Sequence, residues 1–197
     1  MVEEVETRVA RVGTDPIWGY THCLRVYVLA RELGVAEDLR FDAELLYIAA
    51  LLHDIGLYKP YAHRKEPDHA RRSAAVAGQF SRDAGFPAQE TEIILDAIEH
   101  HPPDAPAGSS AEAVLLKDAV ALDYLGAVGV SRVISMVGPD HGIPDLAAAV
   151  QNIRSLHESL PKLLILESSR NLARGRIAET EHFTEALTNA TANLKLL

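Results

Sequence analysis

The sequence contains 197 residues, enough for one compact domain that buries roughly two-thirds of its unfolded surface without disulfide bonds. Cys23 is the single cysteine, so no internal disulfide can form, and the net charge of −9 opposes binding to a nucleic acid duplex. The acidic first residues lack the layout of a signal peptide and no apolar run is long enough to cross a bilayer. We therefore expect a cytoplasmic protein without a membrane partner.

Apolar side chains recur at helical spacing along the whole sequence, and no convincing alternating strand pattern interrupts them. We therefore predict an all-α fold. Asp15-Pro16 is a strong helix start, because Asp caps free amides and Pro fits the first turn, and Gly34 should end that helix. The expected helices cover residues 15–33, 42–53, 67–85, 87–101, 111–125, 131–137, 145–160, 161–173 and 179–196.

The organisation that we expect is a single domain over residues 1–197. A motif-bearing core of about residues 16–130 precedes a helical C-terminal extension of about residues 131–197, in which no residue is tied to chemistry. An apolar stripe of the extension should pack on the core or on a second subunit, so a homodimer is one expectation. That stripe contains Leu156, Leu160, Leu163 and Leu164.

The pair His53-Asp54 follows an apolar segment, residues 46–52, at the predicted end of a helix. A carboxylate there is costly to bury without a partner. Adjacent helical side chains point about 100° apart, so both can reach one metal ion only where the helix ends, and Gly56 supplies that ending. A polar helix terminus, with the histidine favoured by the helix dipole, explains the pair equally well.

Two further residues place a ligand-type group on a buried helix face. His22 shares an apolar stripe of the first predicted helix, and Asp118 shares one of the helix over residues 111–125. A buried carboxylate is rare unless it is paired, hydrogen-bonded or bound to metal. The competing interpretations are a hydrogen-bonded core imidazole for His22 and an ion pair with Arg25 or Lys117 for Asp118.

Taken together and in order, residues 22–26, 49–56 and 117–118 resemble the motifs of the HD superfamily of metal-dependent phosphohydrolases. The resemblance covers about residues 20–130. It implies an HD-domain helical bundle with additional C-terminal helices, in which one divalent cation is bound. The ligands that the resemblance implies are His22, His53, Asp54 and Asp118.

Two more histidines resemble features of the family. His69 resembles a helix-borne histidine that follows the His-Asp pair in many members, and spacing favours His101 over His100 as a histidine that follows an Ala-Ile pair. If His69 and His101 face inward, they can bind a second metal ion or act as acid and base, while Asp54 can deprotonate water. A solvated helix end is the competing interpretation for residues 100 and 101.

Imidazole and carboxylate ligands suit Mn²⁺, Fe²⁺, Zn²⁺, Ni²⁺ or Mg²⁺, and no thiolate is positioned to select a softer metal. We expect one ion per chain, although the extra histidines would also allow two. Arg25, Lys59 and Arg64 are the candidates for contacts to substrate phosphate, because arginine offers bidentate geometry. Arg71 is a fourth candidate. Ordinary solvated charge is the competing interpretation for all four residues, and for Arg71 it is the favoured one.

The expected reaction is hydrolysis of a phosphate ester or phosphoanhydride of a small, nucleotide-like molecule by a metal-activated water. Val120 and Ala121 stand where bacterial relatives often have Asp and Arg, which counts against a nucleoside triphosphate as substrate. Residues 20–27 and 46–47 are also similar to the cyanamide-hydratase branch, so a hydratase or lyase acting on a nitrile-like molecule is a rival. A di-iron oxygenase and a non-catalytic metal-binding helical module are two further rivals.

Overall fold

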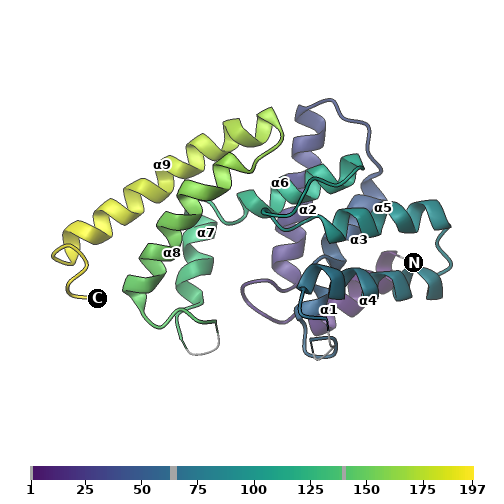
Figure 1. Ribbon diagram of the computed structural model, residues 1–197, viewed down its shortest axis with the longest axis horizontal. Helices are drawn as coiled ribbons and strands as arrows, with labels where there is room; N and C mark the ends of the chain where they lie inside the picture. The colour runs from purple at the N-terminus through teal and green to yellow at the C-terminus, as the bar shows by residue number, and fades with distance from the viewer. Residues whose placement is uncertain (1, 63–65, 139–140) are drawn as a thin grey trace. The chain divides into compact units, whose positions relative to one another are not determined.

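The computed structural model describes residues 2–62, 66–138 and 141–197. These residues form helices, which confirms the predicted all-α class (Figure 1). The β-pairing found among them consists of two isolated bridges, which join Val137 and Gly138 to Ile143. Within the same residues, every helix falls short of the length or the apolar character that a membrane span requires. The chain divides into two compact units, residues 1–120 and 121–197.

The first unit is built around one helix that is buried along most of its length. Its elements are α1 (Val2–Val12), α2 (Tyr20–Ala36), α3 (Ala43–Leu52), the 3-10 turn η1 (Ile55–Leu57), α4 (His69–Asp83), α5 (Ala88–Glu99) and α6 (Ala111–Leu122), whose last two residues belong to the second unit. The central helix is α3, which packs against α1, α2, α4 and α5. From Leu45 to Leu52 only Tyr47 escapes full burial, as expected for a helix that is apolar on every face.

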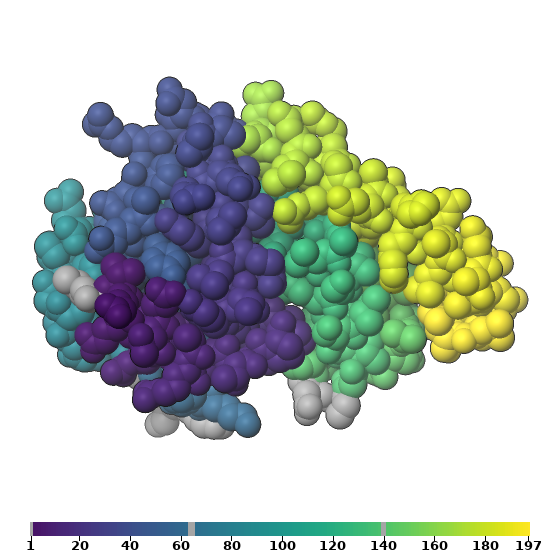
Figure 2. All heavy atoms as spheres, turned by 180° about the vertical axis from the view of Figure 1, so that it is seen from behind, coloured from purple at the N-terminus to yellow at the C-terminus, as the bar shows by residue number. Residues whose placement is uncertain are grey.

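The N-terminal part of this unit differs from the prediction. No helix is expected before residue 15, yet α1 forms there, buries two valines and lies on the surface of the unit in Figure 2. The next helix begins at Tyr20 and not at Asp15. The Asp15 carboxylate accepts hydrogen bonds from the amides of Ile17 (2.8 Å) and Trp18 (3.2 Å) and so closes a tight turn in place of a helix start.

The end of α2 also differs, because Gly34 lies inside the helix and does not end it. A Cβ atom at this position would lie 2.3 Å from the Phe41 ring, so the glycine permits close packing of that ring. The chain leaves the helix a few residues later, where Asp38 adopts a left-handed conformation with φ of 52°. Gly34 is therefore required for packing and not for ending the helix. The sequence alone does not distinguish these two roles of a glycine.

The second unit contains α7 (Gly126–Ser135), α8 (Leu146–Ser159), the 3-10 turn η2 (Leu160–Lys162) and α9 (Glu167–Ala190). Its apolar cluster joins the first two of these helices through Val130, Val133, Ile143, Ala149 and Ile153. The buried Arg132 pairs with Asp123 at 3.0 Å and stacks on the Tyr124 ring at 4.0 Å.

Two predictions for this unit are wrong in their boundaries. The sequence predicts separate helices over residues 161–173 and 179–196, but α9 is continuous from residue 167 to 190 because Gly175 lies within it and costs only about 1 kcal/mol relative to alanine. The helix expected at residues 131–137 begins at Gly126. Its free amides are capped from α9, by Glu179 and Thr180, and such distant capping leaves no local signal in the sequence.

Candidate metal centre

The His53-Asp54 pair lies where α3 ends, as the prediction required. Asp42 caps the start of this helix by accepting hydrogen bonds from the amides of Glu44 and Leu45, and His53 is its C-cap. The chain then turns into η1, so the two side chains converge: His53 Nε2 lies 3.3 Å from Asp54 Oδ2. Both residues are buried.

Close packing of η1 on α4 fixes the turn that carries Asp54. The Gly56 amide donates to the Ser73 hydroxyl at 3.0 Å, inside the unit. A Cβ atom at Gly56 would lie 2.8 Å from both the Arg72 Cβ and the Ser73 amide nitrogen. Arg72 also holds this turn, because its Nε donates to the Gly56 carbonyl at 3.1 Å. Gly56 thus does more than end a helix: it lets the Asp54 turn approach the helix that begins at His69.

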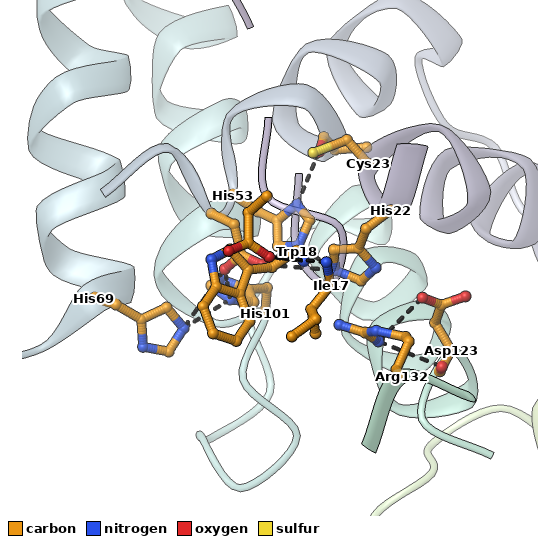
Figure 3. Close-up of polar contacts among 12 residues, drawn as sticks. Ile17, Trp18, His22, Cys23, His53, His69, His101, Asp123 and Arg132 are labelled. Carbon is orange, nitrogen blue, oxygen red and sulfur yellow. Dashed lines mark hydrogen bonds and ion pairs between the residues drawn. The ribbon is translucent and has the colours of Figure 1, made fainter. Parts of the chain in front are cut away.

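Asp54 is shared by two groups of potential metal ligands. The four histidines of these groups, His22, His53, His69 and His101, are labelled in Figure 3. In the first group, the Nε2 atoms of His22 and His53 lie 3.2 Å apart, at 3.6 and 3.3 Å from Asp54 Oδ2. In the second group, the Nε2 atoms of His69 and His101 also lie 3.2 Å apart, at 3.8 and 3.7 Å from Asp54 Oδ1. Each carboxylate oxygen therefore faces one pair of histidines.

These spacings fit divalent cations. Bonds of about 2.0–2.2 Å to nitrogen and oxygen place neighbouring ligand atoms about 2.8–3.1 Å apart in octahedral coordination and about 3.3–3.6 Å apart in tetrahedral coordination. The separations in the first group reach 3.6 Å and stay within these limits, whereas those in the second group reach 3.8 Å and are slightly wider. Because the donors are imidazole and carboxylate, the set suits first-row divalent metals or Mg²⁺ and does not select one of them.

Backbone carbonyls orient two of the imidazoles. The Nδ1–H of His53 donates to the Ala50 carbonyl at 2.7 Å, and the Nδ1–H of His101 donates to the Ile98 carbonyl at 2.6 Å. Each acceptor is a carbonyl of the last helical turn, which has no partner in the helix itself. In its neutral form each ring therefore carries its lone pair on Nε2, directed at Asp54, as a metal ligand requires.

Burial and mutual charge set the protonation of the cluster. Burial lowers the pKa of His101 to about 3, with the neighbouring His53 acting in the same direction, so this ring is neutral at pH 7. Burial would also lower the pKa of His53, but the Asp54 carboxylate outweighs it and raises that pKa above its usual value. For Asp54, the nearby imidazoles outweigh burial and hold the pKa well below its ordinary range, so the carboxylate is ionised.

The sequence left open whether His100 or His101 faces the site, and the structure places His101 there. His101 is 2% exposed and belongs to the second ligand group. The His100 ring instead turns to α5, where its Nδ1 lies 3.1 Å from the Asp96 carboxylate. Because His100 is only partly exposed, a solvated helix end describes neither ring.

Asp118 is buried on α6 with 1% exposure, as its helical stripe predicts. It belongs to neither of the two ligand groups found among the described residues, so its role as a fourth ligand stays a prediction. The adjacent Lys117 is also buried, and its ammonium donates to three backbone carbonyls of the segment after His101. Sequence reasoning missed this arrangement, because backbone acceptors leave no residue pattern.

The residues proposed to contact phosphate differ in their location and exposure. Arg25 lies on α2, three residues after His22, and is partly exposed, whereas Lys59 follows η1 and is exposed. Arg64 lies outside the described residues. The Arg71 side chain is 72% exposed and 3.9 Å from Asp68, in line with ordinary solvated charge.

A family model for the HD domain matches residues 19–125. A deoxyguanosinetriphosphate triphosphohydrolase-like protein of Corynebacterium glutamicum is 37% identical over 87 residues, which is 44% of this chain but only 18% of that protein. The chain thus matches less than a fifth of the length of this relative.

Solved structures share the fold over nearly the whole chain. YpgQ of Bacillus subtilis, solved in complex with ADP, has a TM-score of 0.68 at 22% identity, covering 96% of this chain and 97% of YpgQ. A predicted HD superfamily hydrolase from an uncultured Thermotogales bacterium has a TM-score of 0.67 at 24% identity, covering 96% and 90%. At these identities the likeness concerns the fold.

Proposed function

The chain belongs to the HD-domain family, and from this premise we propose that it is a metal-dependent hydrolase that cleaves a phosphate ester or phosphoanhydride of a small, nucleotide-like molecule. One observation carries the proposal: a buried, ionised carboxylate presents each of its oxygens to a pair of histidine Nε2 atoms. Buried charges of this kind are costly unless they are paired or bind metal.

The residues of the first group hold the cation, with Asp118 as the proposed fourth ligand. When bound, a divalent cation supplies Lewis acidity toward a phosphoryl oxygen and lowers the pKa of water from about 15.7 toward 7. His53 is ready for this role, because its Nδ1–H is already engaged by the Ala50 carbonyl. Little movement of the ring is therefore needed, and the cation would take the place of the proton on Nε2.

His69 is the residue of the cluster that can exchange protons with substrate and solvent. Its side chain is 37% exposed, whereas those of the other three histidines are at most 2% exposed. His101 beside it has its pKa lowered to about 3 and is a poor proton donor at neutral pH. We therefore propose that His69 transfers protons and that His101 binds metal. The sequence left both roles open for both residues.

A phosphorylated, nucleotide-like substrate is supported by two relatives. One is described as deoxyguanosinetriphosphate triphosphohydrolase-like, and the other, YpgQ, was solved with ADP. Arg25, Lys59 and Arg64 remain the proposed contacts to phosphate. The acidic net charge of −9 favours a small phosphorylated molecule over a duplex as partner.

The test is phosphate or pyrophosphate release from a panel of nucleotides and phosphate esters, with Mn²⁺, Fe²⁺, Zn²⁺, Ni²⁺ and Mg²⁺ added separately. Wild type should turn over at least one compound, and His53→Ala should lose that activity by at least about 100-fold. His182→Ala, which removes an exposed histidine of α9, is the matched control and should retain it. No release from any compound by the metal-loaded wild type would refute the proposal.

A di-iron oxygenase is the second candidate, because the two oxygens of Asp54 face two separate histidine pairs and could bridge two ions. This function predicts two irons per chain and consumption of dioxygen with an organic substrate. Metal analysis of protein purified without an affinity tag separates the candidates, since a single ion per chain opposes the oxygenase.

A further inference from the structure

The segment that follows His101 is held from α6. Residues 102–110 form most of the connection between α5 and α6. The Lys117 ammonium, on a residue only 4% exposed, reaches back to the start of this segment. It donates three hydrogen bonds, to the carbonyl oxygens of Pro102 (2.9 Å), Pro103 (2.7 Å) and Ala105 (2.6 Å). An ammonium carries three N–H donors, so these carbonyls satisfy all of them.

The far end of the same segment is held from α5. Asp96 Oδ2 accepts hydrogen bonds from the amides of Ser109 (2.9 Å) and Ser110 (2.8 Å), and from the Ser109 hydroxyl (3.2 Å). The Ser110 hydroxyl in turn accepts from the Ala113 amide and caps the first turn of α6. Each helix thus anchors the end of the other: α5 holds the start of α6, and α6 holds the exit from α5.

His101 depends on this anchorage because it lies beyond the last helical residue, Glu99. Its ring is tied to α5 through the Ile98 carbonyl, whereas its backbone lies outside the helix and leads directly into the segment that Lys117 holds. The next two residues, Pro102 and Pro103, have no amide hydrogen and cannot hold the segment by donating. Apart from the Ala105 amide, which donates to the Pro102 carbonyl, it is Lys117 that engages these carbonyls.

We propose that Lys117 is a positioning residue, which fixes the segment after His101 and thereby holds the His101 ring in the metal centre; its consequence for catalysis rests on the proposed function. Burying an ammonium is unfavourable unless charge-assisted hydrogen bonds replace its water. Without it, the carbonyls of Pro103 and Ala105 would lose their donor and that of Pro102 would keep only the Ala105 amide, so the segment would relax. Because Asp118 directly follows Lys117, one turn of α6 carries both the candidate ligand Asp118 and the residue that supports His101.

The decisive variant is Lys117→Met, which keeps most of the side-chain volume and removes the donors. The first measurement is the NMR resonance of the hydrogen-bonded Nδ1–H of His101, with the corresponding resonance of His53 as internal reference, in metal-free and Zn²⁺-loaded protein. We expect the His101 signal to broaden or disappear while the His53 signal persists. Calorimetry should show Zn²⁺ affinity weakened by about 10–100-fold, the usual effect of losing an outer-layer support.

Lys117→Arg is the second variant, for the case in which the methionine does not fold. It keeps the charge, but a planar guanidinium cannot direct its donors at three converging carbonyls as an ammonium does, so we expect a smaller change in the same direction. Ile153→Ala is the matched control for general destabilisation, because it opens a cavity in the apolar cluster of the second unit.

Two results would overturn the proposal. One is a folded Lys117→Met protein whose His101 resonance and Zn²⁺ affinity equal those of wild type. The other is an equal loss of both in Ile153→Ala at a matched melting temperature, which would make the effect one of stability alone. If wild type releases no phosphate while the His101 signal still depends on Lys117, the proposed function fails and the positioning role stands.

Discussion

Gly56→Ala tests how closely η1 must approach α4 to form the metal centre. The added methyl group would lie 2.8 Å from the Arg72 Cβ and the Ser73 amide nitrogen, and 2.9 Å from the His69 carbonyl. Ordinary contacts begin at 3.4 Å, so the turn has to move by about 0.5 Å or more. Overpacking of this kind costs about 1–3 kcal/mol. At about 2–4 °C per kcal/mol for a chain of this length, the melting temperature should fall by about 2–12 °C.

The movement should also separate Asp54 from the second histidine pair, because Asp54 lies two residues before Gly56. The distances from Asp54 Oδ1 to His69 and His101 are already 3.8 and 3.7 Å, slightly wider than the separation of two ligands of one ion. We therefore expect weaker Zn²⁺ binding by calorimetry together with the lower melting temperature measured by circular dichroism.

Gly78→Ala is the matched control, since Gly78 is a buried helical glycine whose added Cβ would meet its nearest neighbour at 3.4 Å. Its melting temperature should stay unchanged or rise, because alanine is favoured in a helix by about 1 kcal/mol. An unchanged stability and Zn²⁺ affinity in Gly56→Ala would refute the reasoning, as the turn would then have room that the structure denies it.

Two further predictions concern pH and metal. Burial alone would raise the pKa of the Asp96 carboxyl, but hydrogen bonds from Ser110 and Ser109 outweigh it and hold the pKa below its ordinary value. The ionised group therefore stabilises the fold above about pH 4, and this contribution is lost as the pH falls through the lowered pKa. Asp96→Asn should melt below wild type at pH 7, with the difference shrinking toward pH 3; a constant difference would contradict this. Zn²⁺ at 100 times its Kd should stabilise wild type by about 2.7 kcal/mol in thermal unfolding, and His53→Ala should remove the effect.

The parts of the fold that sequence predicts well are those with local causes. The helix over residues 43–52 agrees with its prediction almost to the residue, because Asp42 caps it through its own neighbours and the run that follows is apolar. The predicted start of α2 is five residues early, since Asp15 can cap a helix or close a turn with the same hydrogen bonds. The amides at the start of α7 are capped from residues about 50 positions away, which no local pattern reveals.

In the candidate site, too, the features with local causes could be predicted and those that depend on distant residues could not. Side chains on a helical stripe, such as His22 and Asp118, are buried as their spacing predicts. That His101 and not His100 enters the cluster depends on the exact turn at the end of α5, which spacing only favours. The support from Lys117 has no signal in the sequence because its partners are carbonyls, and every residue has one.

The burial of α3 from Leu45 to Leu52 has a consequence for the lifetime of the site. A helix packed by four others opens only when the whole unit unfolds, so its amides should be among the slowest in the protein to exchange with solvent deuterium. His53 and Asp54 sit at the end of this helix, while His69 begins α4 at the surface. Fluctuations that release His69 would therefore leave His53 and Asp54 in place. A bound ion would keep these two ligands while the contact to His69 opens and closes.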